Sequence, residues 1–160
     1  MILGLSAFTV IHVLISLAGI VSGLIVIRGF LLSAWLDGWN RIFLVTTALT
    51  SITGFFFPYE GKVLPSHILG AISLVVLIPV VYAWAARRLM GGWRTVYLVG
   101  AVAAEYFNCF VLVAQVFLKV PSLHTLAPTG TEPAFGVAQG VLLLIFLWLG
   151  WQSVRRFHPE

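Results

Sequence analysis

Five long apolar runs restrict what this 160-residue chain can fold into. They cover residues 2–27, 41–57, 66–86, 95–118 and 135–154. A helix that crosses a bilayer needs roughly 20 mostly apolar residues, and only helices and closed barrels satisfy every backbone polar group in lipid. These runs are too long and continuous for barrel strands. The sequence therefore predicts an all-α polytopic membrane protein, with five transmembrane helices in one bundle that forms a single domain over residues 1–160.

The composition supports a membrane protein and argues against two other classes. Charged residues make up 9% of the chain and hydrophobic residues 61%, whereas a soluble domain carries about 25% charged residues. The net charge of +4 comes from basic residues scattered at the ends of the runs, so we expect lipid and not nucleic acid as the partner. The single cysteine, Cys109, excludes an internal disulfide and a Cys-x-x-Cys motif.

The arginines predict how the bundle is oriented. If five spans alternate in direction, seven arginines fall on one side of the membrane and two lysines on the other. The arginines are Arg28, Arg41, Arg87, Arg88, Arg94, Arg155 and Arg156, and the lysines are Lys62 and Lys119. Because cytoplasmic loops are enriched in Lys and Arg, the N-terminus is predicted outside and the C-terminus in the cytoplasm.

The fourth run carries a stripe of polar residues. At about 100° per residue, Glu105, Asn108, Gln115 and Lys119 lie within roughly 40° of one line. Charged and amide side chains inside a membrane normally face the bundle interior or a wet cavity, so we expect Glu105 and Asn108 to face protein. Their expected partners are the Thr9, His12 and Ser16 face of the first run and Gln139 of the fifth.

Small residues form stripes that predict close helix packing. In the first run, Gly19-x-x-x-Gly23 is a typical helix-contact pattern. In the second run Thr47, Ser51 and Gly54 share a face, and in the fifth Gly136, Gly140 and Gly150 align. Packing through Gly19 and Gly23 could also join two copies of the chain into a homo-oligomer.

Most of the polar residues are predicted on the outer side, beneath the longest loop, 119–134. We interpret them as one outer-leaflet pocket with the loop as its lid, because long loops are often functional. The proposed ligand-binding residues are His12, His67, Glu105, Asn108, Gln115 and Gln139, and the lid carries Lys119, His124 and Glu132. The ligand could be a quinone, a lipid, haem or a metal.

The histidines allow two kinds of cofactor without specifying one. Two facing span histidines could ligate haem, and His12, His67 and His124 are candidate metal ligands. No ligand pair has a diagnostic spacing, so no metal site is predicted. A hydrogen-bonded headgroup such as a quinone suits both the histidines and the amides.

Three function classes are compatible with these residues. The first is a ligand-binding protein with the outer-leaflet pocket, with or without a redox-linked role. The second is a non-catalytic accessory or assembly subunit of a larger membrane complex. The third is a small transporter that uses Glu105 as a proton-relay residue. The residue pattern does not decide whether the protein is an enzyme.

Several short segments resemble a known family. They are residues 50–58 (TSITGFFFP), 65–67 (PSH), 108–115 (NCFVLVAQ), 119–121 (KVP) and 127–129 (APT). Together they resemble a family of small, uncharacterised bacterial inner-membrane proteins. The resemblance implies a multi-pass protein of the bacterial inner membrane and carries over no function and no catalytic residue.

Overall fold

The computed structural model of the chain describes residues 6–57 and 65–158, which form helices and connecting turns without strands. The long helices are α1 (Ala7–Leu31), α2 (Asp37–Gly54), α3 (Pro65–Ala85), α4 (Gly92–Lys119) and α6 (Pro133–Arg156). The single-turn helix α5 (Pro121–His124) lies between α4 and α6. The prediction of an all-α fold is confirmed for this part of the chain.

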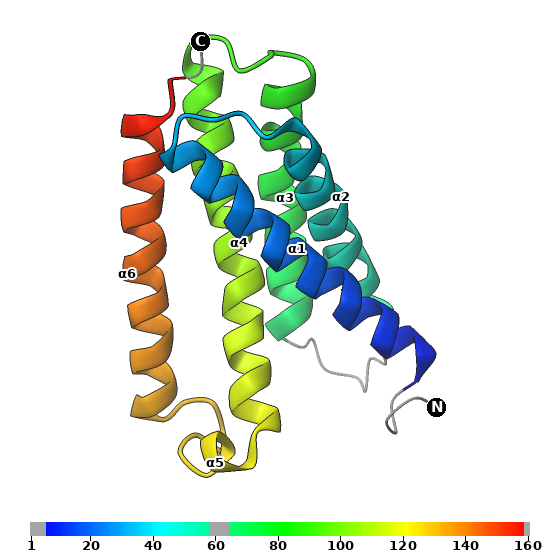
Figure 1. Cartoon of the computed structure of the whole chain (residues 1–160). Coiled ribbons are helices and arrows are strands. Elements are labelled where there is room, and N and C mark those ends of the chain that lie inside the picture. The colour runs from blue at the N-terminus through cyan, green and yellow to red at the C-terminus, as the bar shows by residue number, and fades with distance from the viewer. Residues whose placement is uncertain (1–5, 58–64, 159–160) are drawn as a thin grey trace.

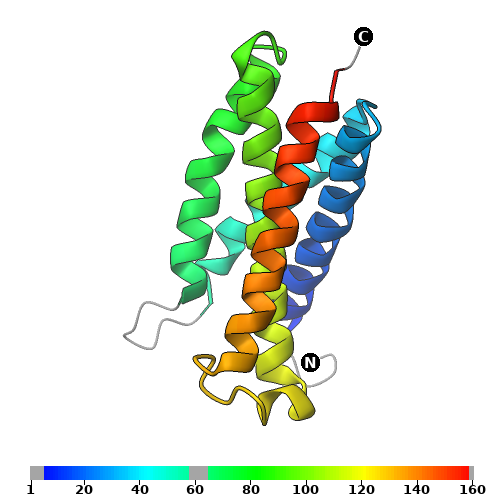
Figure 2. The same cartoon turned by 90° about the vertical axis from the view of Figure 1, so that its left-hand side faces the viewer.

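The long helices run up and down, and each is antiparallel to the next (Figure 1). Helix α4 is the central element because it contacts α1, α2, α3, α5 and α6. Helix α1 crosses the bundle at a steep angle, while α6 packs along the side of α4 (Figures 1 and 2). The N- and C-terminal helix ends lie at opposite ends of the bundle, and the arginine-bearing ends of the helices gather at the same end as the C-terminus.

Local signals set the helix boundaries. Helix α1 begins after Ser6, whose Oγ accepts a hydrogen bond from the backbone N–H of Thr9 at 3.1 Å, an N-cap that occupies an otherwise unpaired donor. Helix α2 begins at Asp37, four residues before the predicted start, and ends at Gly54, three before the predicted end. The Asp37–Arg41 pair, 2.9 Å between Oδ2 and Nε, joins the first turn of α2 to the next. The predicted start of the first span at Ile2 lies outside the described residues.

Four described helices are long and apolar enough to cross a membrane: α1, α3 from His67 onward, α4 and α6. The chain is therefore a multi-pass helical membrane protein that contacts lipid. Helix α2, with 18 residues, is not among the four. Its first turns carry Asp37, Asn40 and Arg41, which lower its mean hydropathy.

The bundle buries several polar groups among its apolar core residues, and large apolar side chains also cover its outer surface. Ile78 is 70% exposed and Leu144 67%, whereas Thr47 and Glu105 are 0% exposed. This arrangement suits lipid as the solvent, because a polar group in contact with acyl chains would be unpaired. One buried polar contact lies near the arginine-rich end, where the Tyr97 hydroxyl donates to Asn40 Oδ1 and Asn40 Nδ2 donates to the Leu36 carbonyl at 2.8 Å.

Candidate functional site

Glu105 lies at the centre of the membrane-embedded core. It follows Gly92, the first residue of α4, by 13 positions and precedes Lys119, the last, by 14. At 1.5 Å per residue it is about 20 Å from each end of the helix. Its side chain is 0% exposed. An acidic group is thus enclosed at the depth where an unpaired charge is most costly.

Two side chains on the same helix donate to the Glu105 carboxyl. Asn108 Nδ2 is 3.2 Å from Oε2, and Cys109 Sγ is 3.5 Å from Oε1. The Asn108 amide also donates to Thr47 Oγ1 of α2 at 3.1 Å. One amide therefore joins the carboxyl to a neighbouring helix. We call Glu105, Asn108, Cys109 and Thr47 the carboxyl site.

The glycine face of α1 closes the carboxyl site. A methyl group at Gly23 would stand 2.2 Å from Glu105 Oε2 and 2.9 Å from Phe43 Cε2. A methyl group at Gly19 would be 3.3 Å from Thr46 Oγ1 and 3.8 Å from Asn108 Nδ2. The two glycines therefore give α2 and α4 the space for their polar side chains. Since this face is buried within the chain, packing through it cannot join two copies in the observed arrangement.

No cation accompanies the carboxyl in residues 6–57 and 65–158. The ion pair found there joins Arg41 to Asp37, at the arginine-rich end. A buried carboxyl whose neighbours are an amide, a thiol and apolar groups can accept a proton or a hydrogen bond, and it has no charge partner to hold it ionised.

The expectation that Glu105 faces protein is confirmed by its burial, and Asn108 bonds to protein on two sides. Their partners are not the expected ones. The first run meets them through Gly19 and Gly23 and not through the Thr9, His12 and Ser16 portion of the same stripe, which lies nearer the N-terminus. The predicted face of α1 does contact α4. Which residues of that face lie beside Glu105 depends on the steep crossing angle of α1, and the sequence of one helix does not reveal that angle. Thr47 was predicted to take part in helix packing, and its hydrogen bond to Asn108 was not predicted.

The two span histidines contact opposite sides of the end of α2. His12 Nδ1 is 2.8 Å from Thr53 Oγ1, and its ring meets Phe57 edge-on with 4.9 Å between centroids. His67 is buried and stacks on Phe55, with centroids 5.8 Å apart. Each histidine is thus held against an aromatic ring of the 55–57 segment.

Gln139 lies on the other side of α4. Its Nε2 donates to the Phe110 carbonyl at 3.1 Å, while its Oε1 is buried and has no hydrogen-bond partner in the described part of the chain. The rings of Phe110 and Phe117 both meet Phe135 edge-on, at 6.4 and 5.5 Å between centroids. An unpaired acceptor therefore lies close to an aromatic cluster between α4 and α6.

The other predicted ligand and lid residues are nearer the surface. Gln115, Lys119 and His124 are exposed, and α5 packs on α4 alone among the helices.

Glu132, in the loop before α6, accepts three hydrogen bonds. They come from Thr129 N at 3.0 Å, Thr129 Oγ1 at 2.8 Å and Thr131 N at 3.0 Å. Desolvation raises the Glu132 pKa, but the hydrogen bonds together outweigh it and hold the pKa below its ordinary value. Glu132 therefore stabilises its own turn.

The structure brings together one pair from the predicted ligand set, Glu105 and Asn108. His12, His67 and Gln139 each have separate partners on α2 or α4. Within the described ranges, no three His, Cys, Asp or Glu side chains are close enough to hold a metal ion.

Comparison with known proteins adds no further assignment. No protein-family model, no curated protein and no solved structure matches the chain.

Proposed function

We propose that the protein is a small proton-linked membrane transporter in which Glu105 is the proton-relay residue. The observation that supports this is a carboxyl that is 0% exposed at the middle of the central helix, with no cation beside it among the described residues. Ionisable groups are rare inside membrane bundles and commonly mark proton relays. Asn108 and Cys109 hold the carboxyl in one position, as a relay residue requires.

Proton exchange at Glu105 needs a conformational step. The Gly23 face of α1 and the ring of Phe43 lie against the carboxyl, so water reaches Oε2 when α1 moves away from α4. A glycine face suits such movement because it has no side chains that interlock with the facing helix. In the open state the carboxylate takes a proton from water on one side; after closure and reopening it releases the proton to the other.

Proteoliposomes with an internal pH dye test this function. Wild-type vesicles should dissipate an imposed pH gradient faster than empty vesicles, and Glu105→Gln should slow this decay by roughly tenfold or more. Glu132→Gln is the matched control, because it makes the same chemical change in a loop turn. Wild-type decay no faster than that of empty vesicles would contradict the proposal, as would undiminished decay in Glu105→Gln.

A second candidate function, binding of a quinone-like ligand, is favoured by the Gln139 environment. The buried Oε1 of Gln139 lacks a donor among the described residues and lies beside the Phe110–Phe117–Phe135 cluster. A hydroxylated ring, such as a quinol headgroup, could donate to that oxygen and pack on the aromatic rings. The ligand site proposed here is formed around Gln139 and does not include His12 or His67, which contact the end of α2.

Extraction of quinones from protein purified in mild detergent tests the second candidate. Gln139→Leu should lose most of the co-purified quinone, whereas Gln152→Leu, the same change near the other end of α6, should retain it. Equal quinone content in the two variants, or none in the wild type, would contradict this candidate.

We also propose that α2 is the fifth span and that the arginine-rich end faces the cytoplasm of a bacterial inner membrane. Helix α2 is about 27 Å long at 1.5 Å per residue, close to the roughly 30 Å hydrocarbon core. Asn40, Thr47 and Ser51 face the bundle, while Val45, Leu49 and Ile52 are exposed. Three of its polar residues thus face protein, and the charged Asp37 and Arg41 lie in its first turns, at the end of the helix. The positive-inside rule supplies the orientation.

A further inference from the structure

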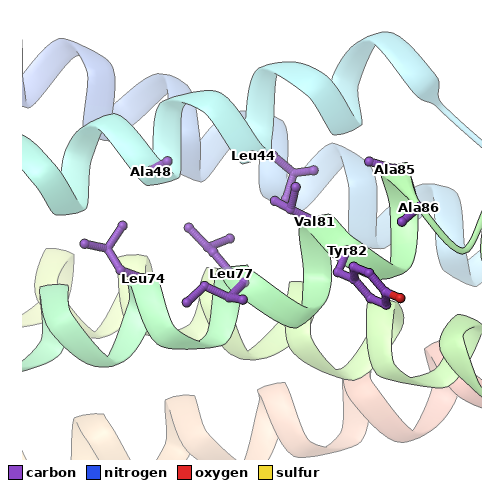
Figure 3. Close-up of a pocket in the computed structure, with 9 residues that line it drawn as sticks. Leu44, Ala48, Leu74, Leu77, Val81, Tyr82, Ala85 and Ala86 are labelled. Atoms are coloured by element: carbon purple, nitrogen blue, oxygen red, sulfur yellow. The ribbon is translucent and has the colours of Figure 1, made fainter.

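A groove between α2 and α3 is separate from the carboxyl site and from Gln139. Its volume is about 560 Å³, within the range of small-molecule sites, and it is open along the side of the bundle. The lining residues are Leu44, Ala48, Leu74, Leu77, Ile78, Val81, Tyr82, Ala85 and Ala86. Figure 3 shows Leu44 and Ala48 of α2 facing the α3 side chains, with Tyr82 contributing the polar atom drawn in red.

Arginines lie next to the lining residues at one end of this groove. Arg41 stands one turn before Leu44 on α2, and its Cζ lies 5.7 Å from the ring centroid of Trp84 on α3. Its guanidinium therefore lies between the two helices that form the groove. Arg87 and Arg88 directly follow Ala86, the last lining residue.

The positive charge at this end is not fully compensated. Asp37 accepts from Arg41 Nε at 2.9 Å, which leaves the two Nη groups without a hydrogen bond to described residues. Arg87 lies over the ring of Trp93, with Cζ 5.6 Å from the centroid, and a cation–π contact does not neutralise the charge. Among the described residues, the three exposed arginines at this end, Arg41, Arg87 and Arg88, are accompanied by one carboxylate, that of Asp37.

The dimensions match one leaflet of a bilayer. The lining extends along α3 from Leu74 to Ala86, about 18 Å at 1.5 Å per residue. Half of the hydrocarbon core is about 15 Å. An acyl chain laid in the groove would thus place its headgroup at the arginine end.

We propose that the α2–α3 groove is a binding site for an anionic phospholipid, with one acyl chain in the groove and the phosphate at Arg41 and Arg87. Two arginines provide planar donor groups that suit phosphate oxygens. A zwitterionic lipid would fill the groove equally well but would gain less from the net positive end. The site is therefore selective through its charge and not through its apolar lining.

Native mass spectrometry of the detergent-solubilised protein tests this site. Phosphatidylglycerol and phosphatidylcholine with identical chains are added at equal concentration. Wild type should prefer phosphatidylglycerol, and Arg41→Gln/Arg87→Gln should reduce that preference by roughly tenfold or more. Arg155→Gln/Arg156→Gln is the matched control, because it removes two charges at the end of α6, and it should keep the wild-type preference.

A second pair of variants tests the groove itself. Ala48→Phe fills the groove and should reduce the binding of both lipids, whereas Val137→Phe, on the exposed face of α6, should not. Glycerol phosphate without acyl chains should fail to compete. No headgroup preference in the wild type, equal behaviour of the two double-arginine variants, or full competition by glycerol phosphate would each overturn the proposal.

Discussion

Gly23 is the residue that gives Glu105 its space. Its missing side chain is the reason that a carboxyl can lie against α1, since a Cβ there would be 2.2 Å from Oε2 and 2.5 Å from Cδ. The Glu105 side chain is fully buried, so it cannot move aside without displacing Phe43 or the Asn108 contact. The close packing of α1 against the carboxyl therefore depends on Gly23, which has no side chain.

We predict that Gly23→Ala destabilises the protein by about 1–3 kcal/mol, the usual cost of overpacking a core. Gly140→Ala is the matched control, because a Cβ at Gly140 meets no heavy atom within 4 Å, and its effect should stay within about 1 kcal/mol. Reversible unfolding in mixed detergent micelles measures both. Equal stability of the two variants would show that α1 does not enclose Glu105 this closely.

At the level of elements, α2 is held to α4 by a polar contact and not only by apolar packing. The Thr47 hydroxyl accepts from Asn108 at 3.1 Å, whereas neighbouring Thr46 donates to the Ile42 carbonyl of its own helix at 2.7 Å. Thr47 thus bonds to a neighbouring helix, whereas Thr46 bonds within its own helix. Hydrogen bonds between helices in membranes are worth about 0.6 kcal/mol on average, so the effect should be modest but measurable.

A double-mutant cycle tests this contact. Thr47→Val combined with Asn108→Leu should show a coupling free energy of about 0.6–1.7 kcal/mol in unfolding. Thr46→Val combined with Asn108→Leu should be additive, because Thr46 bonds within its own helix. Additivity in both cycles would contradict the assigned contact between α2 and α4.

The sequence predicted the number of long helices more accurately than their contacts. The apolar runs found the approximate positions of all five, because each of these helices contains a long apolar stretch. The predicted start of α2 was four residues too late, because Asp37 and Asn40 are polar residues typical of loops. In the structure Asn40 is buried and Asp37 is paired with Arg41. The stripe pattern predicted the wrong residues of α1 as partners of Glu105. The crossing angle of two helices and the residues at which they meet are set by packing between the helices.

At the scale of the whole molecule, charge is distributed unevenly along the bundle axis. The arginine-bearing helix ends gather at the end of the bundle where α3 joins α4 (Figure 1), and Lys119 lies at the other end with the connection to α6. This asymmetry was predictable from sequence, because it requires only the span order and the positions of charged residues.

Accessibility labelling in membrane vesicles of known sidedness tests the proposed topology. A cysteine at Met90, between α3 and α4, should react only from the cytoplasmic face with a membrane-impermeant maleimide. A cysteine at Leu126, between α5 and α6, should react only from the opposite face. The wild type is the control, because its Cys109 is buried. Labelling of both positions from one face would refute an alternating bundle, and reversed labelling would refute the orientation.

The most direct test of the account is whether Glu105 exchanges a proton in the membrane. Infrared difference spectra after a pH jump in proteoliposomes report the C=O stretching band of a protonated carboxyl. We expect the wild type and Glu132→Gln to share a pH-dependent carboxyl band that is absent from Glu105→Gln. If Glu105→Gln gives the same difference spectrum as the wild type, Glu105 does not exchange a proton and the proposed relay is wrong.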